Sequence, residues 1–468
     1  MNAKLIAGVA GAAVLAAAVV VGGAAVTGSQ AKKQLQAVPL AWQTQWPMLK
    51  VVDQSYDKHL FSATHKVTLQ IGCTPAAGAA SGGPLLLTFS QRVQHGPLPG
   101  FSGVAAAVID TELALPEAQR KALAELTGNQ PPLTAHTVVG LTGGHHTRVV
   151  MPQFQARGPK GEQFSWQGLQ MDIDSNGSTF KYDLSLPGAS VSARDEKMAI
   201  DMKLAGIKAH GEANGSGSLW LRAGKAEGEL GLLELSMAGP AAQAQPPLKL
   251  SFSQLKLSSD SSLDKGLMSG TGRFSGHGAV GDLKLDKIDM QVSIKRLHAA
   301  SYERLMQHMM DVSNTCDASQ AAVAPQMLLA QMQEDLLGLL PFSPEYSLDK
   351  LALEIDGKRG EASYAFGVNG VSEAELKQPL PALLMSKAQL RGQAKLPLAW
   401  VESALARFGG GQGDAAAQAE MMNLMLTRMT NDGFVVREGD MLSTQFSFDK
   451  GQMLVNGKPL GRPGAPGP

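Results

Sequence analysis

The stretch Phe180-Lys181-Tyr182-Asp183-Leu184-Ser185-Leu186 decides the fold class of this chain. Apolar and polar residues alternate in it with a period of two, the period at which side chains share one face of a β-strand. The same alternation recurs in Leu169/Met171/Ile173, Met198/Ile200/Met202/Leu204, Leu248/Leu250/Phe252, Leu351/Leu353/Ile355 and Tyr364/Phe366/Val368. This pattern predicts antiparallel strands with one apolar face and one solvated face.

Short glycine-containing segments separate these runs. Ser175-Asn176-Gly177-Ser178 and Asn214-Gly215-Ser216-Gly217 are typical of hairpin turns. The alternation changes phase after Phe252 and again after Leu285. A strand exchanges its faces only through a local irregularity, so we expect bulges or tight breaks at both places. The sequence therefore predicts a long antiparallel meander.

A helical period appears only in patches. Apolar residues recur at helical spacing in 115–126, 301–311, 327–340 and, after a candidate N-cap at Asp414, in 415–429. Such stripes most often pack an amphipathic helix on a sheet. The expected fold is α+β and rich in strands: a long antiparallel sheet with supporting helices, placed after one amino-terminal transmembrane helix.

The amino-terminal segment predicts a membrane anchor. Leu5 to Val26 carries no charged residue and, at about 1.5 Å per residue, would form a helix of about 33 Å, enough to cross a ~30 Å hydrocarbon core. A cleaved signal peptide is the alternative, since small residues stand at 22–25. We favour an uncleaved anchor, because signal peptides usually have an apolar region of only about 7–15 residues. The large carboxyl-terminal part is expected to be exported.

Composition suggests four segments. We expect an anchor in residues 1–30, a strand-rich part in 31–240, a mixed strand and helix part in 241–460, and a disordered tail in 461–468. The main boundary is placed at the Ala/Gln/Pro-rich stretch 238–247.

Charge and cysteine content restrict the partners. Lys+Arg and Asp+Glu both number 41, so the net charge is zero and no basic field favours nucleic acid. Cys73 and Cys316 are the two cysteines, and no CxxC is present. They are either a disulfide across a loop of about 240 residues or two unrelated thiols.

One motif carries a family resemblance. His95-Gly96-Pro97, followed by Leu98-Pro99, resembles the HGP signature of the YdgA-like family, bacterial inner-membrane-anchored envelope proteins of unknown function. Residues 56–63 and the ending 451–460 are similar to further elements of that family in the same order. The resemblance implies a single-pass inner-membrane protein with the bulk of the chain in the periplasm. It implies no reaction, and we interpret His95, Gly96 and Pro97 as structural.

Candidate catalytic motifs fail one by one. The segment 451–458 has one residue too many for a phosphate-binding Walker loop, 270–276 lacks the dinucleotide spacing, and no G-x-S-x-G occurs. His145 and His146 are adjacent, so on a strand they would point to opposite faces and could not share a metal. We therefore expect no catalytic site, metal or cofactor.

Three functions remain open. The leading one is a non-enzymatic envelope protein that binds lipid, other apolar material or partner proteins along its sheet. The first alternative is a structural or assembly factor that acts as a homodimer; Gly8, Ala12 and Ala16 would stack on one side of the spanning helix and allow close contact. The second alternative, least favoured, is a hydrolase with an unrecognised site. The membrane itself is the remaining expected partner.

Overall fold

The structure is a computed structural model of residues 1–468. It describes residues 35, 36, 39, 49–72, 85–101, 103–115, 117, 120, 121, 127–158, 161–194, 198–214, 221–239, 247–313, 332–408 and 415–460. The predicted span at 5–26, both cysteines, Asp414 and the tail 461–468 lie outside these residues, as does most of the helix expected at 115–126. Among the described residues, no helix combines the length and apolarity needed to cross a bilayer.

Two compact units make up the chain, one of residues 1–254 with 303–332 and one of residues 255–302 with 333–468. In the first unit, each strand of the sheet pairs antiparallel with the next strand in the following order. Their order is β1 (Leu49–Lys58), β2 (Ser62–Ile71), β3 (Leu85–His95), β4 (Ala107–Ala114), β5 (Thr134–Val139), β6 (His145–Met151), β9 (Leu169–Ser175), β10 (Thr179–Arg194), β11 (Ala199–Asn214) and β12 (Ala223–Ala238).

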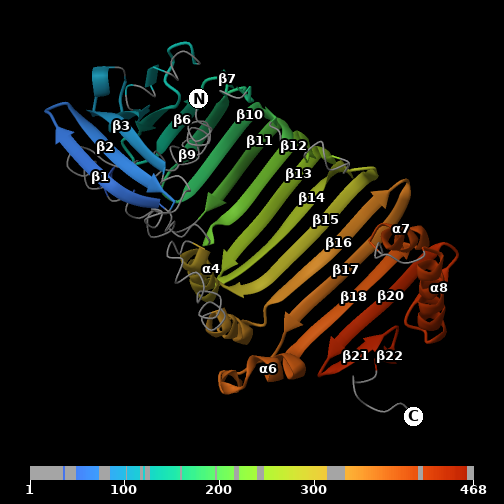
Figure 1. The fold of residues 1–468 in the computed structure, drawn as a ribbon. Coiled ribbons are helices and arrows are strands. Elements are labelled where there is room, and N and C mark those ends of the chain that lie inside the picture. Colours follow the sequence, from blue (N-terminus) through green and yellow to red (C-terminus); the bar gives the residue numbers. More distant parts are fainter. Residues whose placement is uncertain are drawn as a thin grey trace, which may run out of the picture. The chain divides into compact units, whose positions relative to one another are not determined.

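A short hairpin extends this sheet. Strands β7 (Phe154–Arg157) and β8 (Gln163–Trp166) pair with each other, and β8 pairs with the second half of β10. Strand β13 (Leu248–Asp264) begins in the same unit. Figure 1 shows that β1–β3 run in a direction different from that of β10–β12, so the sheet twists strongly along its length.

The early strands of this unit bury the centre of one face. One core cluster contains Leu49 of β1, Phe89 of β3, Trp166 of β8 and Leu186 of β10, so apolar side chains from well-separated strands converge on one core. A second cluster, with Ala63, Val93, Ala107, Ile109 and Val139, lies near the ends of the strands and includes Leu35.

A polar row crosses this buried face. Nδ1 of the His65 ring lies 2.7 Å from Oε1 of Gln91, and Nε2 of Gln91 donates to Oγ1 of Thr111 at 3.2 Å. The three residues are directly paired across β2, β3 and β4, and each is at most 1% exposed. Buried polar groups of this kind are tolerated because each finds a partner.

The second unit is also an antiparallel sheet. Its strands pair in the order β14 (Leu267–Val280), β15 (Leu283–His298), β16 (Glu345–Ile355), β17 (Lys358–Val368), β18 (Ala388–Pro397), β20 (Met441–Asp449), β21 (Gln452–Val455) and β22 (Lys458–Pro459). Strand β19 (Val436–Glu438) pairs with β20.

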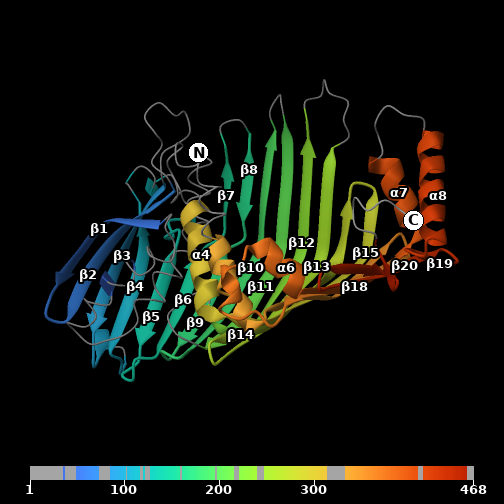
Figure 2. The same ribbon diagram turned by 90° about the horizontal axis from the view of Figure 1, so that it is seen from below.

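Helices accompany the second sheet. Helix α6 (Leu380–Lys387) contacts β18 and β20, and its Leu383 is fully buried in a cluster with Leu340, Val368 and Ala388. Helices α7 (Leu398–Phe408) and α8 (Ala415–Asn431) contact each other, as Figure 2 shows. Helix α4 (Ala299–Ser313) lies between β15 and β16 in sequence.

The predicted strands and their antiparallel order are confirmed, whereas residues 215–217 of the second expected turn lie outside the described residues. The Asn176 turn joins β9 to β10, and Oδ1 of Asn176 accepts a hydrogen bond from the Thr179 amide at 2.8 Å. Both phase changes coincide with irregularities. Gln254 has a φ of +51°, and the register of β15 shifts beside Leu285. The helices expected at 301–311 and 415–429 are present as α4 and α8.

Candidate functional site

An apolar row crosses β8, β10, β11 and β12 in the first unit. Phe164 pairs with Val191, Val191 with Met202, and Met202 with Leu235. Beside it, Ala189, Leu204 and Leu233 form a second row in the same way. Directly paired residues of an antiparallel sheet lie on one face, so all seven side chains share a face. We call these seven residues the apolar ladder.

Strict alternation along β10 would place the ladder residues of this strand on the face opposite to its earlier apolar residues. Leu186 and Ala189 are three positions apart and nevertheless pack against the same core cluster. In β11 the phase changes at Gly206, whose φ of +67° is accessible to glycine and strained for other residues. The pairing stays in register on both sides of it. The local break therefore keeps one apolar face continuous along the strands.

Burial separates the ladder from the rest of this face. In β2, Val67 and Leu69 are 0% exposed, and in β3 Phe89 and Val93 are 0% exposed. All seven ladder residues are only half-buried. The polar residues Ser190, Ser192 and Asp201 of the opposite face are also half-buried. Phe164 and Ala189 pack against the core cluster, and the ladder as a whole is less fully covered than the centre of the early strands.

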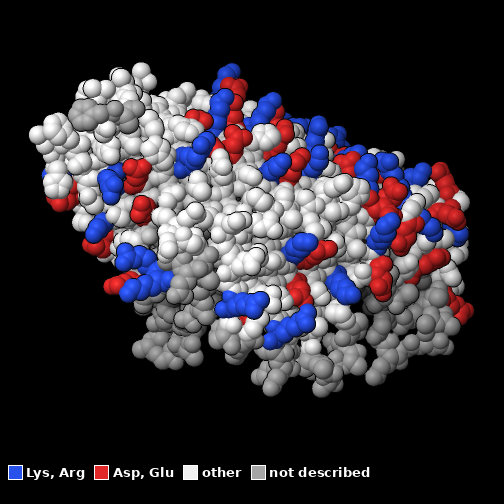
Figure 3. Space-filling view, turned by 90° about the horizontal axis from the view of Figure 1, so that it is seen from above, with Lys and Arg blue, Asp and Glu red and all other residues white. Residues whose placement is uncertain are grey.

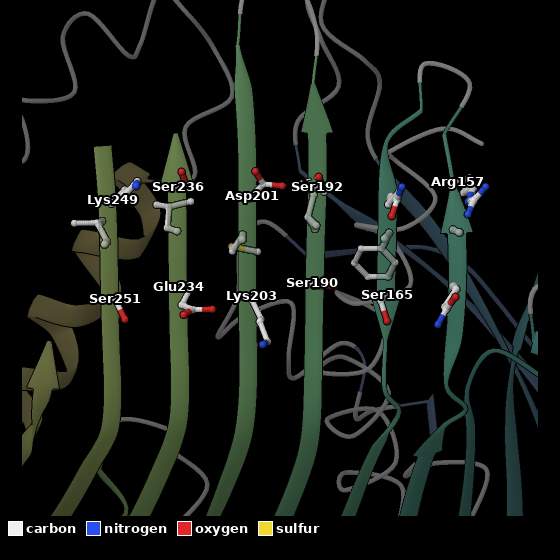
Figure 4. A pocket seen from close by; sticks show the side chains of 18 residues that line it. Arg157, Ser165, Ser190, Ser192, Asp201, Lys203, Glu234, Ser236, Lys249 and Ser251 are labelled. Carbon is white, nitrogen blue, oxygen red and sulfur yellow. Dashed lines mark hydrogen bonds between the residues drawn. The ribbon is translucent and has the colours of Figure 1, made fainter. Parts of the chain in front are cut away.

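A groove of about 990 Å³ lies along the same line of strands (Figure 4). Its lining takes three consecutive residues from each of six strands, with the row from Phe164 to Leu235 in the middle. On either side of that row stand polar residues: Arg157, Ser165, Ser190, Ser192, Asp201, Lys203, Glu234, Ser236, Lys249 and Ser251. Ala189 and Leu204, which would flank the row on the apolar face, do not line the groove. The groove is thus lined by one apolar residue and two flanking residues from each strand.

Charges on the polar face are arranged in alternating signs. Nδ1 of His136 lies 2.7 Å from Asp110, Nε of Arg148 donates to Asp172 at 2.7 Å, and Lys181 lies 3.1 Å from Glu212. Basic and acidic residues also lie next to one another over the surface in Figure 3. Over the described part of the surface, such mixing gives no field of a single sign that would attract a strongly charged partner.

The HGP motif lies at the end of β3. The amide of His95 donates to the carbonyl of Phe61 at 2.9 Å, and the Gly96 amide donates to the carbonyl of Ala106 at 2.7 Å. The Gly96–Pro97 peptide bond is cis. A Cβ on Gly96 would lie 2.1 Å from the carbonyl oxygen of Ala105, so the turn admits only glycine there. This placement gives the motif a structural role in joining β3 to its neighbouring turns.

The imidazole of His95 is enclosed. Its two ring nitrogens are buried, and the Ser62 backbone lies beside the ring. Burial, followed by the Lys58 charge, lowers the pKa of His95. No catalytic partner approaches it within the described part of the chain, so its geometry does not form a nucleophile and base pair.

His145 and His146 do point to opposite faces. His145 is 9% exposed and its ring nitrogens have no partner, whereas His146 is exposed and its Nδ1 lies 2.9 Å from Asp174. The acidic neighbour was not evident from the sequence, because β6–β9 pairing brings it from 28 residues away. Within the described ranges, no group of three His, Cys, Asp or Glu side chains could hold a metal ion.

The two glycine-rich segments are parts of strands and turns. Residues 270–276 lie within β14. Asn456 and Gly457 form the turn between β21 and β22 with φ of +49° and +77°, and Nζ of Lys458 donates to the carbonyl of Asp432 at 2.8 Å. Neither segment opens a helix, which is the context that phosphate-binding loops require.

Comparison with known proteins identifies a family. A family model described as "Bacterial protein of unknown function (DUF945)" matches residues 2–461. No curated protein and no solved structure matches the chain.

Proposed function

Because the chain belongs to the bacterial protein family of unknown function DUF945, we propose its function from its own surfaces: it binds hydrocarbon chains, such as lipid acyl chains, on the apolar ladder. In this proposal it is a non-enzymatic envelope protein, anchored in the inner membrane by residues 5–26. The resemblance of His95-Gly96-Pro97 to the YdgA-like signature supports the anchor and the periplasmic placement.

The half-burial of the ladder carries the proposal. The ladder continues the face on which Val67 and Phe89 are fully buried, and its own residues are accessible. An accessible apolar strip that continues a core is a binding surface for apolar material, because covering it removes apolar area from water at about 25 cal/mol per Å².

The chemistry of the ladder favours a hydrocarbon occupant. Its seven side chains are those of Phe, Val, Met, Leu and Ala, so it offers an occupant no polar side-chain group. Methionine adapts its shape to different contacts. The row from Phe164 to Leu235 crosses four strands, or about 15 Å at ~4.8 Å per strand. That length is close to half of the ~30 Å hydrocarbon core, which is the reach of one acyl chain.

Lipid binding is tested on the full chain. We expect native mass spectrometry of the detergent-purified protein to show co-purified lipid, and cis-parinaric acid to gain fluorescence on binding. The double variant Met202→Gln, Leu204→Gln should lose at least about tenfold in parinaric acid affinity, since each burial contributes roughly 1.5–3 kcal/mol.

A matched control stands on the same strand. Lys203 is exposed and points to the opposite face, so Lys203→Gln should bind like the parent protein. Equal loss in both variants, or no lipid and no parinaric acid signal in the parent, would show that the ladder is not a hydrocarbon site.

Anchoring is tested separately. A reporter active only outside the cytoplasm, fused after Pro468, should be active, and the mature chain should retain Lys4. Recovery of a soluble chain starting near Ala25 or Thr27 would identify residues 5–26 as a cleaved signal peptide.

A further inference from the structure

Five large apolar side chains protrude from the turns at one end of the first unit. They are Leu60, Phe61, Leu98, Val104 and Leu141, and their exposed fractions range from 50% to 83%. We call them the apolar rim. Leu60 and Phe61 lie in the β1–β2 turn, Leu98 and Val104 in the β3–β4 connection, and Leu141 in the β5–β6 turn. Single exposed apolar residues are ordinary, but five on adjacent turns at one end form a surface.

Backbone hydrogen bonds join the three turns that carry the apolar rim. The His95 amide donates to the Phe61 carbonyl at 2.9 Å, which joins the first turn to the second. The Ala106 amide donates to the Val139 carbonyl at 2.8 Å, which joins the second to the third. The HGP motif lies at the first of these junctions. The protruding side chains are therefore carried on a connected backbone.

The predicted anchor leads into the described structure at this same end. Leu35 is 2% exposed in a cluster with Ala63, Ala107 and Val139, which are the strand residues next to the three turns. Nε2 of Gln54 donates to the Leu35 carbonyl at 3.3 Å. Val26, the last residue of the apolar segment, is nine residues before Leu35. Nine residues span at most about 30 Å, so the end of that segment cannot be far from the rim.

We propose that the apolar rim is a membrane-contact surface, at which these five side chains enter the interfacial layer of the bilayer that holds the anchor. The inference rests on the proposed anchoring by residues 5–26. The five side chains protrude from separate turns, and a fluid lipid surface accepts such protrusions without a shaped pocket. Near the rim, Asp57 and His59 lie 3.4 Å apart and Lys58 adds one positive charge. We therefore expect insertion to depend on apolar contact and little on anionic lipid.

Photolabelling of the full chain in vesicles tests this contact. The vesicles contain phosphatidylcholine with a trace of phosphatidylcholine that carries a diazirine on its acyl chain, and labelled peptides are identified by mass spectrometry. We expect label in the peptide of residues 5–26 and also in peptides that contain Leu60–Phe61, Leu98–Val104 and Leu141. Leu86 near the start of β3 and Met198 just before β11 are exposed apolar residues away from the three turns; they are internal controls and should stay unlabelled.

A variant tests whether these side chains make the contact. Leu60→Ser with Phe61→Ser changes two exposed residues, so the fold should persist by circular dichroism. The label in that turn should fall at least about fivefold, as expected when two large apolar side chains no longer partition into lipid. The variant Leu86→Ser should leave the pattern unchanged.

The outcomes separate the rim from the anchor. Label confined to residues 5–26 would keep the anchor and overturn the rim. Label at the rim without label in 5–26 would overturn the anchor and keep a lipid-contacting rim. Equal label at Leu86 and Met198, no label anywhere, or rim label that appears only on dilution, which would indicate a second copy covering the turns, would each overturn the proposal.

Discussion

Gly206 of β11 lies against Gly231 of β12, so that a Cβ built on Gly206 would be 3.5 Å from the Cα of Gly231. The two glycines stand at the line where both strands change phase while their pairing stays in register. Pro187 and Gly188 occupy the corresponding place in β10. Backbones approach closely here because no side chain stands between them.

We expect Gly206→Ala to destabilise the first unit. Its φ of +67° costs an alanine about 1–2 kcal/mol, although the added Cβ meets only ordinary contacts. Gly228→Ala on β12 is the control, because its φ is ordinary and its new Cβ would be 3.9 Å from the nearest backbone oxygen. Urea unfolding followed by circular dichroism should show a lower midpoint for the first variant alone. An unchanged midpoint would refute the strain argument.

Substitution of Gly96 should be more damaging. In Gly96→Ala the new Cβ would meet the carbonyl oxygens of Ala105 and Ala106 at 2.1 and 2.7 Å. Backbone must move to relieve these contacts, and a loss of roughly 2–4 kcal/mol is expected. Gly239→Ala, with open space around it, should unfold like the parent. Equal stability of both variants would show that the HGP turn is looser than the geometry indicates.

Removing the central member of the buried polar row should cost stability through its orphaned partners. Gln91→Leu leaves the His65 ring and the Thr111 hydroxyl buried without that partner. We expect a loss of about 1–3 kcal/mol in the free energy of unfolding. Gln155→Leu, at an exposed position of β7, is the matched control. A Gln91→Leu variant as stable as its control would contradict the assigned network.

Acid should destabilise the first unit through its buried histidines. Burial is the main cause that lowers the pKa of His65, His95 and His145. Below a pH of about 6.5, the unfolded state takes up protons that these folded imidazoles resist, so stability falls as the pH drops. The urea midpoint should decrease from pH 7.5 to 5.5. His145→Gln should flatten this slope, and an unchanged slope in that variant would contradict the assignment.

The second unit should lose stability in a second, more acidic pH range. The Ser372 amide and hydroxyl donate to Oε2 of Glu375, both at 2.9 Å, and Nζ of Lys387 lies 3.0 Å from Oε1. The Ser372 backbone bond is the largest cause that lowers the pKa of Glu375 to about 2. Its stabilising effect is present above the unfolded pKa and lost as the pH falls from about 4.5 toward 2. Glu375→Gln should therefore unfold more easily than the parent at pH 7, and this difference should shrink near pH 2.

Period-two alternation was sufficient to predict β9, β10, β11, β13, β15, β16 and β17, because each residue's face follows from its neighbours along the chain. The breaks after Phe252 and Leu285 were visible for the same reason. Strands β12 and β14, and the strands before β9 and after β17, were not predicted individually. The break at Gly206 was not recognised, since its neighbours Ala205 and Leu204 are both apolar and hide the change of phase. Pairing across strands was also beyond the sequence, and with it the placement of Asp174 beside His146.

The apolar ladder and the apolar rim could be identified only from the structure, for a different reason. The sequence shows Met202 and Phe89 as equivalent members of apolar alternations. Only their burial distinguishes a position in a dry core from one on the ladder. Similarly, Leu60, Leu98 and Leu141 are far apart in sequence, and the order of the strands brings their turns to one end.

The polar row of His65, Gln91 and Thr111 also favours one register of β2 against β3. Sliding β2 by two residues along β3 would preserve which face is apolar, so hydrophobic burial alone distinguishes poorly between the two alignments. The slide would place the His65 ring opposite Phe89 or Val93 and would remove the Gln91 partner of its Nδ1, whereas its Nε2 lies 2.9 Å from Nε2 of Gln54 on the other neighbouring strand. Each misaligned sheet would thus contain imidazole and amide groups that neither water nor protein satisfies. The row therefore favours the native register of the strands. A sequence with valines in its place would lack this preference and would be free to assemble with shifted strands.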